Sequence, residues 1–120
     1  MENYDEHIAR ILQNWDKLQS EIKALFDKRD NRNAITPMKK GIDLLGEFMF
    51  LTNGLPVSQE SDFDYHSLEL KPVNLSERLQ FLKMRPNIYP SFVQLIELFE
   101  EQQKHYAKAQ AIRKAQRIDK

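Results

Sequence analysis

The stretch RPNIYPSF, Arg85 to Phe92, contains two prolines four residues apart, Pro86 and Pro90. A residue that precedes proline is disfavoured in α geometry, so a helix before this stretch must end near Met84. The same rule keeps Tyr89 non-helical, as a helix cap requires, and Pro90 then suits the first helical position, where its missing N–H is not needed. The stretch is therefore predicted to be a joint between two helices.

Apolar residues recur every three or four positions on both sides of this joint, which is the period of amphipathic helices. Leu75, Leu79 and Leu82 form the predicted buried edge before it, widened by Phe81, and residues 92–106 continue the pattern after it. The sequence predicts an all-α fold, a single-domain bundle over residues 1–120 without a sheet. Its four main helices are expected near residues 3–28, 37–53, 75–84 and 90–117.

Short-range signals predict the other helix ends. A polar linker at 27–33 is followed by Thr36-Pro37, a pair that suits a capped helix start. Asn53-Gly54 predicts the end of this second helix, since both residues tolerate left-handed geometry. Asn74 with Glu77 three positions later resembles a capping box and predicts the start of the third.

We expect three residues to affect how the helices pack. Gly41 and Gly46 lie inside the second predicted helix, and each weakens it by about 1 kcal/mol relative to alanine. We expect them to let another helix approach closely. Phe92 is expected to anchor the joint in the core.

Residues 55–73, LPVSQESDFDYHSLELKPV, show no periodicity and form a long connection for a compact domain. The apolar side chains of Phe63, Tyr65, Leu68 and Leu70 predict that part of this loop packs against the bundle. We expect extended chain with one short turn of helix.

Composition excludes several classes of function. The chain has 120 residues, 18 basic and 18 acidic, so its total charge gives no sign of a polyanionic partner. The absence of cysteine excludes disulfides, thiolate catalysis and cysteine-built metal sites. The acidic start is unlike a signal peptide, and no apolar run reaches the roughly 18 residues of a membrane span, so we expect a cytoplasmic protein that does not bind membranes.

Asp62, Asp64 and His66 alternate within the loop. In an extended chain such side chains project to one side, where they could hold a divalent cation and support a metal-dependent hydrolase. A solvated acidic loop explains the same pattern and is favoured here. No nucleophile, phosphate-loop or zinc-protease motif is present, so we expect no metal, no cofactor and no enzymatic activity.

The end of the chain is basic, with six basic residues from Lys104 to Lys120 against Asp119 alone. Such a helix end complements its own dipole, and we expect residues 105–120 to fray. The alternative is a nucleic-acid surface. Because the basic side is interrupted, we expect only weak nucleic-acid binding. The candidate residues are Arg113, Lys114, Arg117 and Lys120.

Arg85 and Tyr89 are the candidate partner-binding residues. A corner fixed by prolines can present an arginine and a tyrosine to a partner. Equally, the arginine can satisfy helix-end carbonyls and the tyrosine can pack beside them.

Residues 74–108 resemble the YpoC-like domain family of Firmicutes. The resemblance rests on ERLQFL (Glu77 to Leu82), Arg85-Pro86, Tyr89, Ser91-Phe92 with Gln94, and ELFE (Glu97 to Glu100). It implies a small helical bacterial protein without an assigned activity, often encoded near DNA replication, repair or cell-wall synthesis functions, and supplies no catalytic residues. Our leading hypothesis is a non-enzymatic module that binds a protein partner from one of these processes. A nucleic-acid-associated protein is the alternative.

Overall fold

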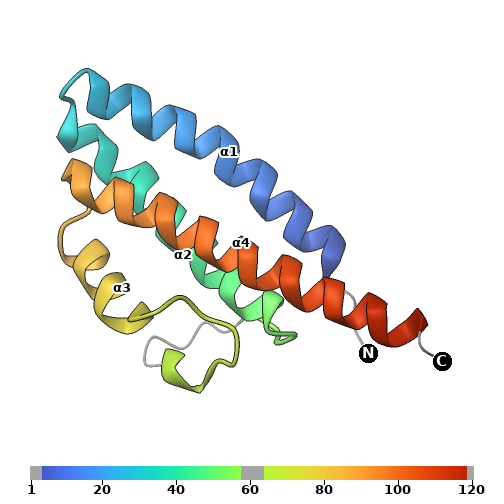
Figure 1. Cartoon of the computed structure of the whole chain (residues 1–120). Coiled ribbons are helices and arrows are strands. Elements are labelled where there is room, and N and C mark those ends of the chain that lie inside the picture. The colour runs from blue at the N-terminus through green and yellow to red at the C-terminus, as the bar shows by residue number, and fades with distance from the viewer. Residues whose placement is uncertain (1–3, 58–63, 119–120) are drawn as a thin grey trace.

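The computed structural model describes residues 4–57 and 64–118. Its elements are α1 (Asp5–Asp27), α2 (Asn31–Thr52), the short 3-10 helix η1 (Tyr65–Ser67), α3 (Leu75–Met84) and α4 (Tyr89–Ile118). The three long helices lie side by side, and the shorter α3 packs against α2 and α4 (Figure 1). No strand occurs in the described ranges, which confirms the predicted all-α bundle of four helices. None of the described helices has both the length and the apolar composition needed to span a membrane.

Aromatic rings fill the centre of the bundle. Trp15 of α1 stacks on Phe99 of α4 with ring centroids 4.3 Å apart, and Phe48 of α2 lies 5.7 Å from the same ring. Phe92 is 2% exposed and stacks on Phe26 at 5.8 Å, which confirms it as an anchor of the joint. Rings from α1, α2 and α4 therefore meet in one core.

The turn between α1 and α2 consists of Lys28, Arg29 and Asp30 alone. Arg29 has a left-handed φ of 60°, and its N–H donates to the carbonyl of Phe26 at 2.9 Å. The N–H of Asp30 donates to the carbonyl of Leu25 at 2.8 Å. Together these two bonds form a Schellman motif, which ends a helix in very few residues.

Asp30 also starts α2, so the predicted linker at 27–33 and the predicted start at Thr36-Pro37 are wrong. Its side chain accepts hydrogen bonds from the backbone N–H of Asn33 at 3.4 Å and from the Asn33 side-chain amide at 2.8 Å. Pro37 lies buried inside α2, where its missing N–H removes only the helical bond to the carbonyl of Asn33.

The end of α2 follows the prediction. Gly54 has a φ of +73° and donates its N–H to the carbonyl of Leu51 at 3.0 Å, while Leu55 donates to that of Phe50 at 3.0 Å. This is a second Schellman motif, with glycine at the left-handed position. The Asn53-Gly54 pair therefore ends α2 as expected.

The bounds of α3 were predicted correctly, but the capping mechanism was not. Asn74 adopts left-handed geometry with a φ of 57°, and its side chain caps no N–H of the helix. Asparagine tolerates this backbone conformation, so Asn74 makes the turn with its main chain instead. At the joint, α4 begins at Tyr89, one residue before the predicted start, so the expectation that Tyr89 stays outside the helix as its cap was wrong. The carbonyl of Ile88 accepts from the N–H of Ser91 at 3.1 Å and closes this first turn.

The two glycines of α2 differ. A Cβ added to Gly41 would lie 2.9 Å from Leu95 Cδ2 and 3.0 Å from Trp15 Cζ3, so this glycine does allow close packing. At Gly46 the nearest atom would be the Tyr65 hydroxyl at 3.6 Å, an ordinary contact, and the expectation of close helix approach was wrong there.

The described part of the long connection packs against the bundle, as expected, and contains one helical turn. Leu68 is buried, and the Asn53 side chain pairs with both backbone groups of Leu70, at 2.8 Å and 2.9 Å. Buried Gln102 donates to the same Leu70 carbonyl at 3.1 Å and to the Thr52 hydroxyl at 2.8 Å. These polar contacts fasten residues 64–73 to the end of α2 and the middle of α4. Phe63 lies outside the described residues.

Candidate functional site

The joint between α3 and α4 presents Arg85 to solvent on a fixed backbone. Arg85 ends α3 by donating its N–H to the carbonyl of Phe81 at 3.0 Å, and its own carbonyl accepts from the Ser91 hydroxyl at 2.5 Å. Its side chain is exposed. The guanidinium makes no hydrogen bond or ion pair with any residue that the structure describes. The Arg85 side chain therefore does not bind the helix-end carbonyls, although its backbone N–H does.

Tyr89 is also exposed at the joint, with 53% of its surface accessible. The edge of its ring meets Phe26 at 5.9 Å and Phe92 at 6.1 Å. One side of Tyr89 thus packs on the core while the rest faces solvent. The described contacts place Tyr89 against α1 and do not join it to Arg85.

Further apolar side chains gather next to the joint. Within the described residues six large hydrophobic side chains are exposed, and four of them fall between residues 73 and 89. They are Val73 at 72%, Phe81 at 39%, Met84 at 71% and Tyr89. The assignment of Phe81 to the buried edge of α3 was therefore wrong. The sequence does contain a signal for this exposure, because Phe81 and Met84 lie outside the helical stripe formed by Leu75, Leu79 and Leu82.

A groove of about 540 Å³ lies between α3 and α4 beside these side chains. It is lined by Asn74, Glu77, Arg78, Phe81 and Gln94. Glu77, Phe81 and Met84 are spaced i, i+4 and i+7, so they lie on one side of α3. The groove and the exposed end of α3 therefore form one continuous surface, here called the α3 surface (Glu77, Phe81, Met84 and Arg85).

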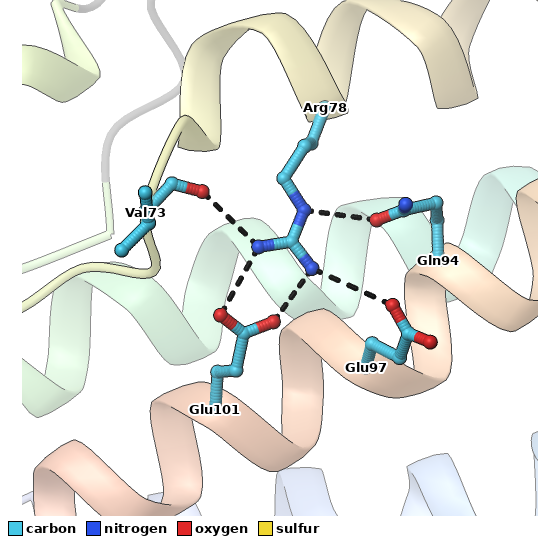
Figure 2. A network of polar contacts seen from close by, with 5 residues as sticks. All are labelled: Val73, Arg78, Gln94, Glu97 and Glu101. Atoms are coloured by element: carbon cyan, nitrogen blue, oxygen red, sulfur yellow. Dashed lines mark hydrogen bonds and ion pairs between the residues drawn. The ribbon is translucent and has the colours of Figure 1, made fainter.

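Arg78 forms the floor of this groove, and Figure 2 shows its contacts. Its two terminal nitrogens bind the Glu101 carboxylate at 3.1 Å and 2.6 Å, one of them also donates to the Val73 carbonyl at 3.1 Å, and Nε donates to Gln94 at 2.9 Å. Glu97 lies 3.8 Å away on the preceding turn of α4. The guanidinium thus bonds to groups of the protein itself. Because Gln94 and Glu101 belong to α4, these bonds hold α3 against α4.

Of the three metal candidates, the structure describes Asp64 and His66. Asp64 accepts a hydrogen bond from the His66 N–H at 2.9 Å and so caps η1, the short helical turn of this loop, instead of pointing to one side with His66 along an extended chain. Asp62 lies outside the described residues. In the ranges that the structure describes, no three histidine or acidic side chains are grouped as metal ligands.

A second hollow of about 270 Å³ lies between α2, η1 and α3. Asp43, Glu47, Tyr65 and Lys83 supply its polar lining. Burial, and then the charge of Asp43, raise the pKa of the Tyr65 hydroxyl. This hollow brings together opposite charges and contains no pairing of nucleophile and base.

The basic end of α4 extends beyond its last contact with α1. The Tyr106 hydroxyl donates to Asp5, and the Gln110 amide donates to the Tyr106 hydroxyl at 2.9 Å. Burial and the bond to Asp5 raise the pKa of Tyr106 to about 12. Residues 111–116 are all exposed, including Arg113 and Lys114. Arg117 belongs to the last turn of α4, and Lys120 lies outside the described residues.

Known proteins that are similar to this chain match it over nearly its whole length. A family model described as YpoC-like protein matches residues 5–114, from the first residue of α1 to the basic end of α4. The protein named "Uncharacterized protein YpoC" from Bacillus subtilis (strain 168) is 30% identical over 113 residues, covering 92% of this chain and 69% of that protein. No solved structure matches.

Proposed function

The chain belongs to the YpoC-like protein family, and from this premise we propose that it is a non-enzymatic cytoplasmic module that binds another protein through the joint between α3 and α4. The observation that carries the proposal is an unpaired, exposed arginine on a fixed backbone next to exposed apolar side chains. Arginine and aromatic residues supply much of the energy of protein interfaces. Exposed apolar patches also mark interaction sites.

The geometry of the joint supports recognition at low entropic cost. The Ser91 hydroxyl fixes the backbone of Arg85, and Phe26 and Phe92 restrict the ring of Tyr89. A fixed backbone at Arg85 and an already restricted ring at Tyr89 lose less freedom when a partner binds. Following the family resemblance, we place the partner in DNA replication, repair or cell-wall synthesis.

Affinity capture tests this function. The full chain, carrying a tag, is incubated with an extract of Bacillus subtilis, the organism of the relative. We expect one defined protein to be retained by wild type and lost with Arg85→Ala, whose melting temperature stays unchanged because Arg85 makes no described side-chain bond. Lys17→Ala is the matched control, since Lys17 is exposed on α1, a helix that does not contact α3 in the described structure.

Two outcomes count against the proposal. Either no protein is retained specifically, or Arg85→Ala and Lys17→Ala retain the same protein equally. The second result would leave the joint without a role in partner binding.

Nucleic-acid binding is the second candidate, because Arg113 and Lys114 are exposed on the projecting end of α4. We expect fluorescence anisotropy with duplex and single-stranded DNA to show only non-specific binding, with a Kd of about micromolar or weaker at physiological salt. Sub-micromolar, sequence-selective binding that is lost on replacing Arg113 and Lys114 by alanine would place this function first. A titration at two salt concentrations measures how far phosphate contacts contribute.

A further inference from the structure

The α3 surface fits one mode of peptide recognition better than the others. The described residues contain no strand, so no sheet edge is available to pair with an extended peptide. Grooves that bind proline-rich peptides are lined by several aromatic rings, and this groove has Phe81 alone. A groove beside a helix that exposes apolar side chains at helical spacing, as α3 does with Phe81 and Met84, suits an amphipathic helix, which inserts side chains spaced i, i+3, i+4 and i+7.

The floor of the groove does not attract an anion. Val73, Gln94 and Glu101 occupy the N–H groups of Arg78, whose side chain is only 19% exposed. Phe81 and Met84 are the apolar side chains that remain exposed beside it. We therefore expect a bound peptide to make its apolar contacts with Phe81 and Met84, next to the polar lining of the groove.

The two ends of the α3 surface carry opposite charges. Glu77, in the first turn of α3, is exposed, and its carboxylate has no ion pair or hydrogen bond within the described chain. Arg85, at the other end, is exposed and equally unpaired, and the exposed Lys83 lies in the last turn. Any helix that lies along α3 thus meets a negative end and a positive end.

We infer that the occupant is a short amphipathic helix from a partner protein, lying antiparallel to α3, with acidic residues in its first turn at Arg85 and basic residues in its last turn at Glu77. This inference rests on the proposed function. Acidic first turns and basic last turns also suit the dipole of the bound helix, and antiparallel helix dipoles attract each other. Because α3 has 10 residues and a helix rises 1.5 Å per residue, the contact extends over roughly 15 Å, or three turns.

The test is a selection from displayed 14-residue peptides against the full chain. Every peptide has apolar residues at helical spacing, and the first-turn and last-turn positions vary freely between glutamate and lysine. We expect enrichment of peptides with glutamate in the first turn and lysine in the last. Enriched peptides, synthesised and labelled, are then titrated by fluorescence anisotropy.

The variants locate the site and the orientation. Phe81→Glu and Met84→Glu should each weaken binding at least tenfold, and Arg85→Glu should reverse the preference towards lysine in the first turn. Lys17→Glu on α1 should leave both affinity and preference unchanged. Circular dichroism confirms that each variant is folded, and two separate apolar positions keep the test decisive if one variant unfolds.

Three outcomes would overturn the inference: no enrichment, enrichment without charge order, or peptides that bind the Phe81 and Met84 variants as well as wild type. If a protein is still captured from extract in an Arg85-dependent way, the proposed function stands and only the helical occupant is wrong. If capture fails as well, the protein-binding function itself is contradicted.

Discussion

At the scale of single residues, Gly41 sets how closely the long helices approach. Its missing side chain leaves space that Leu95 of α4 and Trp15 of α1 occupy from two directions. Gly46, five residues later on the same helix, has no such neighbours. The same residue type in one helix thus serves packing at one position and merely weakens the helix at the other.

Replacing each glycine by alanine separates these effects. Gly46→Ala should raise the free energy of unfolding by about 0.5–1 kcal/mol, because alanine is the better helix former and nothing obstructs its methyl group. Gly41→Ala should lower the free energy of unfolding. Overpacking costs about 1–3 kcal/mol, which outweighs the gain in helix propensity from alanine. Urea denaturation measures both, and stabilisation by Gly41→Ala would contradict the tight packing of Trp15.

Two phenylalanines close to the joint, like the two glycines of α2, differ in their surroundings. Phe92 is 2% exposed and Phe81 is 39% exposed. Phe92→Ala should lower the free energy of unfolding by about 3–5 kcal/mol, the usual loss for a buried phenylalanine. Phe81→Ala should lower it much less, and equal losses in denaturant melts would show that Phe81 acts as a core residue.

At the scale of elements, α3 depends on Arg78 for its position. α3 is short, and its apolar contacts come mainly from Leu75, Leu79 and Leu82. Arg78 adds bonds to Gln94 and Glu101 of α4 and to the Val73 carbonyl, at the start of α3. A single side chain therefore fixes both the entry into α3 and its orientation on α4.

Arg78→Ala should lower the free energy of unfolding by about 1–3 kcal/mol, because partly buried charged hydrogen bonds are lost together. Arg78→Lys should recover only part of this, since lysine cannot bind a carboxylate in bidentate fashion. Arg10→Ala is the control: Arg10 pairs with Glu6 at 3.6 Å on the surface of α1, and such pairs contribute about 0–1 kcal/mol. A loss for Arg78→Ala no larger than that for Arg10→Ala would show that Arg78 does not hold α3.

The sequence predicts these elements well where a local signal ends them. Pro86, Pro90 and Gly54 act within one or two residues, so the ends of α2, α3 and the start of α4 were predicted to within one residue. The turn at Arg29 was missed, because a left-handed arginine has no distinctive sequence signal and the polar run around it resembled a linker. Arg78 was missed as well, because its partners depend on how α3 lies on α4. Arg85 and Tyr89 were identified as candidates, whereas the exposure of Phe81 depends on that same packing.

At the scale of the whole molecule, Tyr106 and Gln110 tie the late part of α4 to Asp5, the first residue of α1. In Figure 1 the blue start of α1 lies beside the red part of α4. The stacked rings of Trp15 and Phe99, by contrast, join α1 to α4 nearer the centre of the bundle. The Asp5–Tyr106 bond therefore closes the far end of the bundle.

The pKa of Tyr106 makes this closure depend on pH. Burial and Asp5 raise it from 10.0 to about 12, so the folded state holds the phenolic proton more tightly than the unfolded state. The resulting stabilisation is complete below pH 10 and is lost as the pH rises towards 12. Tyr106→Phe should flatten the fall in stability over this range, measured by denaturation at several pH values, although Tyr65, whose pKa is also raised, keeps some slope. An unchanged slope would contradict the raised pKa of Tyr106.

The stacking of Trp15 on Phe99 gives the molecule its own optical reporter. Trp15 is the single tryptophan in the chain and is 2% exposed, so its fluorescence should emit at the short wavelengths of an apolar environment. Any separation of α4 from α1 would bring water to the indole and shift the emission to longer wavelengths. Because α1 does not contact α3 in the described structure, a peptide bound along α3 should leave the spectrum unchanged. One unlabelled measurement can thus distinguish a variant that has lost its binding surface from one that has lost its core.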